Sequence, residues 1–129
     1  TIYNAPMKTL ESKLIVSGIL FLLMIITGIV LSRNGKPYGT GLVTLHKLFS
    51  IAALVVVILA FAQQMKAAPN PLWTLMAVIA GVLFIAAIAS GALLTGEKAM
   101  PDWISLVHKL STPAIILVIG FTFYKFLTT

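Results

Sequence analysis

Four long apolar segments determine what this chain can fold into. They cover about residues 14–32, 42–62, 72–95 and 104–127, and each approaches the roughly 20 residues that a helix needs to cross a bilayer. Inside lipid the backbone N–H and C=O groups must bond within the segment itself, so such runs are predicted to be helical. None of them alternates apolar and polar residues as membrane β-strands do. With short connections between them, they predict an all-α membrane protein, a four-transmembrane-helix up-down bundle.

The composition supports a membrane location. Hydrophobic residues make up 60% of the 129 residues and charged residues only 9%, whereas a soluble domain carries roughly 25% charged residues. We therefore expect an integral, multi-pass protein in contact with the lipid bilayer, located in a prokaryotic plasma membrane. The net charge of +6 is typical of topology and headgroup signals, and no basic stripe interleaved with aromatic residues suggests nucleic acid. The sequence has no cysteine, which excludes disulfides and iron–sulfur clusters.

The sequence also contains an internal repeat of two helices. With a shift of 63 residues the first segment aligns with the third, and Thr27-Gly28 falls on Ser90-Gly91. With a shift of 62 residues the second segment aligns with the fourth. We therefore predict a single domain built from two parallel helix-pair repeats, related by a pseudo-twofold axis along the membrane normal. The domain covers residues 1–129, with repeat 1 over about 14–66 and repeat 2 over about 72–127.

The two histidines of the chain, His46 and His108, occupy matching positions in this repeat. Their helices are predicted to run in the same direction, so we expect both histidines at one depth, near the membrane face that carries the loops 33–41 and 96–103. A bond to a backbone carbonyl would explain either histidine alone. Two ionisable residues at matching depths inside a membrane instead favour a functional pair, because such residues are costly there. Helix bundles often build metal and haem sites from side chains on facing helices.

Haem suits this pair better than a bare metal ion. Two nitrogens leave Zn²⁺ or Cu²⁺ short of ligands, and neither a cysteine nor a well-placed carboxylate completes the set. Haem iron already has four porphyrin nitrogens and takes two axial ligands. We therefore predict that His46 and His108 are the metal ligands of one haem between the second and fourth helices.

Four further residues accompany the histidines in both repeats. Gly28 and Gly91 lie on the first and third helices, where the edge of a haem needs missing side chains. Close helix packing explains such glycines equally well. Ser50 and Thr112 each lie four residues after a histidine and are expected to keep the same helix face narrow.

Three cations are also candidates for the haem site. Lys47 and Lys109 directly follow the histidines, and Arg33 begins the first loop. A contact with the haem propionates is one interpretation of these side chains. The other interpretation, which applies to the two lysines, is that their ammonium groups reach the lipid headgroups while their apolar stems stay in the membrane.

A four-helix membrane protein with one histidine on its second helix and one on its fourth resembles the membrane b-type cytochromes. The resemblance covers the architecture of the whole chain and rests on a short motif. It implies haem b held by His46 and His108 and flanked by Gly28 and Gly91. Many of those cytochromes carry a further histidine on each helix for a second haem. This sequence has none, which implies one haem b per chain.

From these features we expect an electron-transfer protein, since two filled axial positions favour electron transfer over oxygen activation. One haem near one face leaves much of the membrane uncovered. The expected partners are therefore a quinone or a redox protein, with the chain acting as a subunit of a membrane oxidoreductase, or in an oligomer, rather than as a stand-alone enzyme. The alternative is a non-redox membrane subunit or a small transporter that uses the histidines as structural or proton-sensitive groups. Against a proton-coupled transporter, the predicted membrane segments contain no acidic residue that could relay protons.

Overall fold

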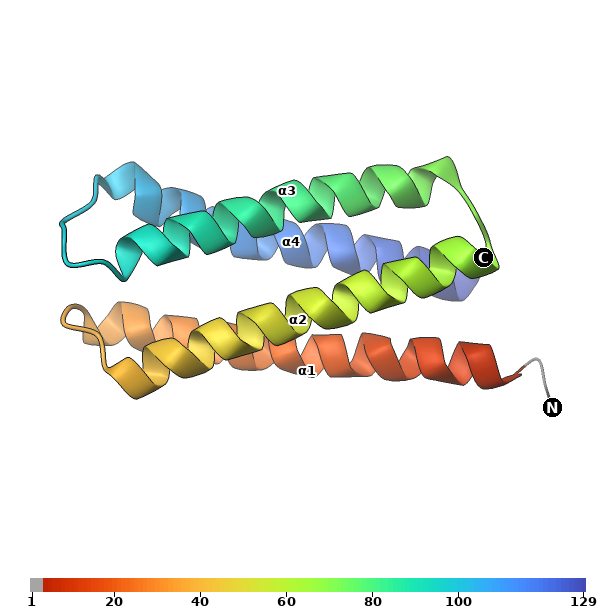
Figure 1. Ribbon diagram of the computed structural model, residues 1–129, viewed down its shortest axis with the longest axis horizontal. Helices are drawn as coiled ribbons and strands as arrows, with labels where there is room; N and C mark the ends of the chain where they lie inside the picture. The colour runs from red at the N-terminus through yellow and green to blue at the C-terminus, as the bar shows by residue number, and fades with distance from the viewer. Residues whose placement is uncertain (1–3) are drawn as a thin grey trace. The chain divides into compact units, whose positions relative to one another are not determined.

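The computed structural model describes residues 4–129, with side chains described from residue 8 onward. Four α-helices follow one another in this part of the chain (Figure 1): α1 (Asn4–Asn34), α2 (Thr40–Ala67), α3 (Pro71–Leu94) and α4 (Asp102–Thr128). The described residues contain no strand, which confirms the predicted all-α fold. Each helix is long and apolar enough to cross a membrane, as an integral multi-pass protein requires.

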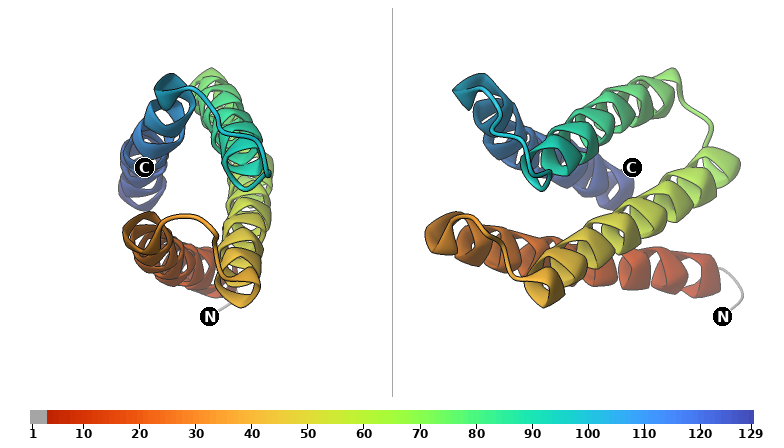
Figure 2. Two further views of the ribbon diagram at one scale, coloured as in Figure 1. Left: turned by 90° about the vertical axis from the view of Figure 1, so that its left-hand side faces the viewer. Right: turned by 60° about the vertical axis from the view of Figure 1, so that its left-hand side comes forward.

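The four helices form two hairpins. α1 packs along α2 and α3 packs along α4, and the chain divides into two compact units between Pro69 and Asn70. Figure 2 shows the paired helices of each hairpin joined by a short loop. Each unit therefore contains one repeat of the sequence.

Two of the helices extend beyond the apolar segments. α1 begins at Asn4 rather than near residue 14, and α2 continues to Ala67 rather than ending near residue 62. The added turns contain Lys8, Glu11 and Lys66. Lysine and glutamate are good helix formers, so the helix can continue where the chain leaves the apolar layer.

Local signals set the ends of the helices. Gly35 has a φ of 67°, and its N–H donates to the carbonyl of Leu31 at 3.1 Å. This left-handed glycine cap ends α1. At the start of α3 the side chain of Asn70 accepts the N–H of Leu72 at 2.9 Å, and Pro71 occupies the first helical position. An asparagine cap followed by proline is a favoured way to begin a helix.

Each helix buries a narrow stripe of side chains. Most of the buried residues recur at intervals of three, four or seven, which is the spacing of one helix face. On α2 they are Ala53, Val57, Ala60, Phe61 and Gln64, and on α4 they are Ile104, Ser111, Ile115, Ile119, Thr122 and Phe126. Small side chains such as alanine and serine allow membrane helices to approach closely.

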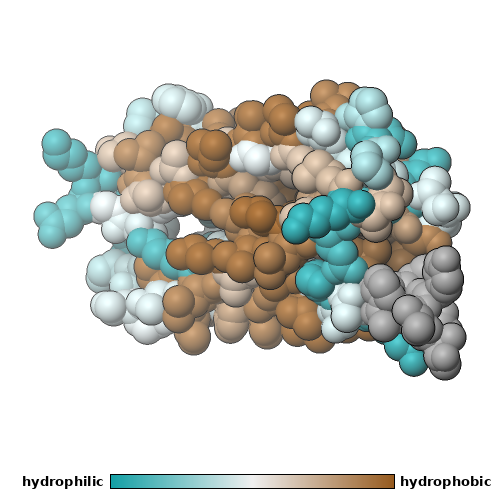
Figure 3. Space-filling model, turned by 45° about the vertical axis from the view of Figure 1, so that its right-hand side comes forward, coloured by the Kyte–Doolittle hydropathy of each residue, from teal (hydrophilic) through white to brown (hydrophobic). Residues whose placement is uncertain are grey.

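The exposed faces of the helices are apolar along their middle stretches. Large side chains there include Leu22, Ile58, Val82, Ile85 and Leu117, all more than half exposed. In Figure 3 brown apolar side chains cover most of the middle of the visible face, and hydrophilic side chains gather toward the helix ends. This distribution is typical of a surface in contact with lipid.

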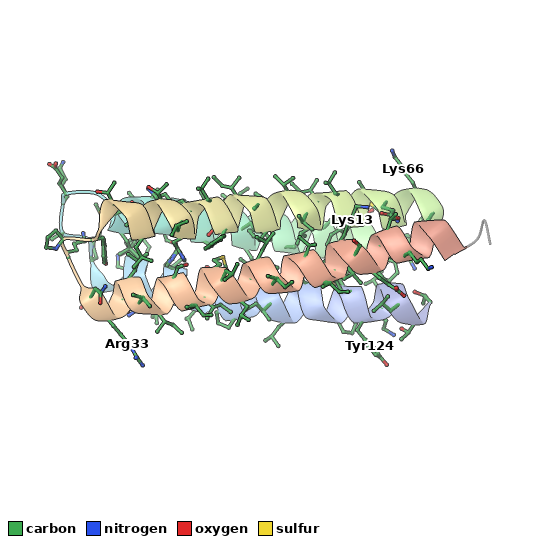
Figure 4. The ribbon with its side chains drawn as sticks, turned by 90° about the horizontal axis from the view of Figure 1, so that it is seen from below. Lys13, Arg33, Lys66 and Tyr124 are labelled. Carbon is green, nitrogen blue, oxygen red and sulfur yellow. The ribbon has the colours of Figure 1, made fainter. Side chains whose placement is uncertain are left out.

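A polar cluster lies in the first unit, near the start of α1 and the end of α2. The ammonium group of Lys13 donates to Oε1 of Gln63, and Nε2 of Gln63 donates to Oγ1 of Thr9 at 3.1 Å. Figure 4 shows Lys13 and Arg33 toward opposite ends of α1. The apolar length of this helix is therefore flanked by cations, as expected for a membrane span.

Candidate functional site

His46 and His108 lie at matching places in the two units. His46 is six residues after Thr40, the first residue of α2, and His108 is six residues after Asp102, the first residue of α4. At the helical rise per residue, each imidazole is carried about 9 Å into its helix. Both side chains are half-buried.

In the first unit, α1 supplies two oxygen atoms to the imidazole of His46. The Nδ1 atom lies 3.0 Å from the carbonyl oxygen of Met24 and 3.0 Å from Oγ1 of Thr27. The single hydroxyl hydrogen of Thr27 points to the backbone of its own helix, with the carbonyl oxygens of Leu23 at 2.9 Å and Met24 at 3.0 Å. Since that hydrogen is engaged, the hydroxyl oxygen presents a lone pair to the histidine.

The second unit repeats this arrangement with different residues. Nδ1 of His108 lies 2.9 Å from the carbonyl oxygen of Ala87 and 3.2 Å from Oγ of Ser90. The hydroxyl of Ser90 donates to its own helix, most closely to the carbonyl of Ala86 at 2.6 Å. Ser90 is also buried, at 4% exposure, so its hydroxyl depends on these internal partners.

These contacts assign the tautomer of both histidines. Each Nδ1 atom faces a carbonyl oxygen, which can only accept, and a hydroxyl oxygen whose hydrogen is engaged within its own helix, so Nδ1 carries the hydrogen and donates it. In the neutral ring the lone pair then lies on Nε2. A histidine that ligates a metal almost always donates its other ring N–H to such an acceptor, which fixes the ring and raises the basicity of the ligating nitrogen. The neighbouring helix thus holds Nδ1 of both imidazoles, while metal ligation by Nε2 stays a prediction.

A glycine lets each ring approach the neighbouring helix. A Cβ atom added at Gly28 would lie 3.1 Å from Cε1 of His46, and one added at Gly91 would lie 2.8 Å from Cε1 of His108. A side chain at either position would press on the imidazole. The structure thus places these glycines against the histidine rings, while their predicted role at the edge of a haem stays a prediction.

We refer to the carbonyl, the hydroxyl and the glycine that hold one ring as an imidazole seat. The seat residues are Met24, Thr27 and Gly28 for His46, and Ala87, Ser90 and Gly91 for His108. Sequence reasoning missed the hydroxyls and the carbonyls. The available signal was the hydroxyl residue directly before the glycine in both repeats.

Ser50 and Thr112, the other two residues expected at the site, lie on the histidine helices α2 and α4. Oγ of Ser50 donates to the backbone carbonyl of His46 at 2.8 Å, so this hydroxyl bonds within its own helix. Thr112 is half-buried on α4. Their expected contribution to a haem-facing surface stays a prediction.

The three candidate cations are exposed. Lys47 and Lys109 follow the histidines on α2 and α4, and Arg33 lies in the last turn of α1. Figure 4 shows the side chain of Arg33 pointing away from its helix. In these places each cation can reach a polar surface, a lipid headgroup or the carboxylates of a ligand.

Residues 8–129 contain no group of three or more histidine, cysteine, aspartate or glutamate side chains that could hold a bare metal ion. Each unit supplies one histidine, and the binding of one haem by this pair stays a prediction. Comparison of the chain with protein-family profiles, with curated proteins and with solved structures finds no match.

Proposed function

We propose that this chain is a membrane electron-transfer protein in which His46 and His108 bind one haem b through their Nε2 atoms. The observation that carries the proposal is the pair of imidazole seats, which give both rings the same tautomer through the same kinds of acceptor. A histidine that merely bonds a carbonyl needs neither a hydroxyl nor a glycine beside it. The seats supply all three in both units.

A haem held by His46 and His108 would supply reversible one-electron reduction of its iron. The residues of the chain provide the surroundings. The seats orient the two Nε2 atoms, and Gly28 and Gly91 admit the rings. The exposed cations Lys47, Lys109 and Arg33 suit the haem propionates because they combine an apolar stem with a charged end.

A protein with one haem needs other molecules to donate and accept its electrons. One haem accepts and releases one electron at a time, so it needs a quinone or a partner redox protein on each side of the transfer. We infer that the chain works as a subunit or in an oligomer, in a prokaryotic plasma membrane. The apolar spans support the membrane part of this inference.

Visible absorption of the purified full-length protein, expressed with ample haem, tests the proposal. A sharp reduced-minus-oxidised b-type spectrum that is lost in both His46→Ala and His108→Ala supports it. Leu48→Ala and Leu110→Ala are matched controls, because each lies two residues after a histidine and is more than half exposed. They should keep the spectrum. A colourless wild-type protein would overturn the proposal and favour a non-redox membrane subunit or transporter.

A further inference from the structure

The hydroxyl groups of Thr27 and Ser90 do more than satisfy their own helices. Each donates its hydrogen to a carbonyl in the preceding turn, at 2.9 Å for Thr27 and 2.6 Å for Ser90. A hydroxyl that donates in this way becomes a better acceptor, since hydrogen bonds in a chain polarise one another. The improved acceptor faces Nδ1 of a histidine in both units, at 3.0 Å and 3.2 Å.

The backbone carbonyl beside each ring is already in use. In an α-helix the carbonyl of Met24 accepts the N–H of Gly28, and the carbonyl of Ala87 accepts the N–H of Gly91. The imidazole N–H shares these oxygens with the helix. The hydroxyl is therefore the acceptor that adds strength and direction to the bond at Nδ1.

We propose that Thr27 and Ser90 are positioning residues that strengthen the hydrogen bond donated by Nδ1–H of each histidine and thereby set the electron density that Nε2 donates to its ligand. The second half of this inference rests on the proposed haem binding, while the first half concerns the protein alone. Thr27 and Ser90 fall on each other in the sequence repeat, so the same device occurs twice with two different residues.

The effect on the haem has a definite direction. A strongly bonded Nδ1–H raises the basicity of Nε2, and a more basic ligand favours ferric over ferrous iron. Removing the hydroxyl should therefore raise the reduction potential and weaken haem binding roughly 10-fold, at the lower end of what the loss of such a ligand-orienting bond costs.

The first experiment uses the haem-free, full-length protein with ¹⁵N-labelled histidine. Two histidines give two sets of ring signals, and the ¹⁵N shifts show which nitrogen is protonated. In the wild type both rings should be protonated at Nδ1. In Thr27→Val the Nδ1 signal of His46 alone should move toward that of a weaker hydrogen bond, and in Ser90→Ala the Nδ1 signal of His108 alone. The carbonyls of Met24 and Ala87 should keep both rings protonated at Nδ1. Unchanged Nδ1 signals in both variants would overturn the proposal.

Ser17→Ala and Thr122→Val are the matched controls. Both residues are buried, and both hydroxyls donate to a carbonyl of their own helix, at 2.9 Å and 2.7 Å. Ser17 lies ten residues before Thr27, and Thr122 lies fourteen residues after His108. If these controls shift the Nδ1 signals as much as the seat variants do, the role assigned to the seat hydroxyls is wrong.

The second experiment measures haem affinity and reduction potential for the same variants. Thr27→Val and Ser90→Ala should weaken binding and raise the potential, while Thr27→Ser and Ser90→Thr, which keep a hydroxyl, should restore both. A wild type that binds no haem would overturn the proposed function, and the Nδ1 signals of the haem-free protein would still decide the positioning role. Haem binding with unchanged Nδ1 signals and potentials would overturn the positioning role alone.

Discussion

A Cβ atom added at Gly91 would lie 2.8 Å from Cε1 of His108, a separation that Cβ atoms do not sustain. The same construction at Gly28 gives 3.1 Å to Cε1 of His46, which is tight but closer to tolerable. Both rings are also tied through Nδ1 to the helix that carries the glycine. A new side chain at Gly91 therefore requires a larger shift of its ring than one at Gly28.

Gly91→Ala should disrupt its seat more than Gly28→Ala does. The added methyl group must displace the bonded ring or push the helices apart, which costs about 1–3 kcal/mol. We expect a fall of roughly 10-fold in haem affinity for Gly91→Ala, comparable to the loss of a ligand-orienting contact. Haem titration and thermal unfolding in detergent measure the two effects.

Gly18→Ala and Gly81→Ala are the controls for these substitutions. An added Cβ at either position meets no described atom within 4 Å. Replacing glycine by alanine in an unobstructed helix gains up to about 1 kcal/mol. Both controls should be at least as stable as the wild type. Equal losses in Gly81→Ala and Gly91→Ala would show that the ring contact is not the cause.

A missing imidazole should be replaceable from solution. His108→Gly removes the proposed ligand. The acceptor oxygens of Ala87 and Ser90 remain, and Gly91 still leaves space for a ring. We expect loss of the low-spin haem spectrum and its recovery on addition of free imidazole, which can donate an N–H to the same oxygens. His46→Gly should behave in the same way. A spectrum unaffected by the loss of His108 would contradict the assignment of this ligand.

The cap of α3 should contribute measurable stability. The side chain of Asn70 accepts the N–H of Leu72 at 2.9 Å, and Asn70 is exposed, so its replacement disturbs no packing. Asn70→Ala should lower the free energy of unfolding by about 1 kcal/mol, whereas Asn70→Asp should retain it. Equal stability of the alanine and aspartate variants in detergent unfolding would argue against the cap.

The contact between Trp73 and Phe126 should respond differently to changes in its two rings. The centroids lie 4.8 Å apart in an edge-to-face arrangement. Nε1 of Trp73 is buried without a hydrogen-bond partner among the described residues. Trp73→Phe removes this unsatisfied donor, so its cost should stay below about 1 kcal/mol, while Phe126→Ala should cost about 3 kcal/mol. A larger loss for Trp73→Phe in the same unfolding assay would contradict this ranking.

Much of the fold could be predicted from the sequence because lipid leaves few alternatives to a helix. The apolar segments predicted four helices, and the third segment, expected from about residue 72, begins close to the start of α3 at Pro71. The start of α1 at Asn4 could not be predicted, since lysine and glutamate continue a helix without any apolar signal.

The site was predicted less completely than the fold. The repeat singled out His46 and His108, but the role of Thr27 could not be read from the sequence. A threonine in a membrane helix usually bonds its own backbone, as Thr27 also does at the carbonyl of Leu23. Its second bond, to Nδ1 of His46, depends on how α1 lies along α2. That register comes from packing and not from any local pattern.

The most direct test of the central claim is the electron paramagnetic resonance spectrum of the oxidised, purified full-length protein. If His46 and His108 are the axial ligands of one haem b, the ferric protein should give a low-spin signal typical of two imidazoles. Its integrated intensity should be about one spin per chain. A high-spin signal, or no haem signal from protein expressed with ample haem, would contradict the account.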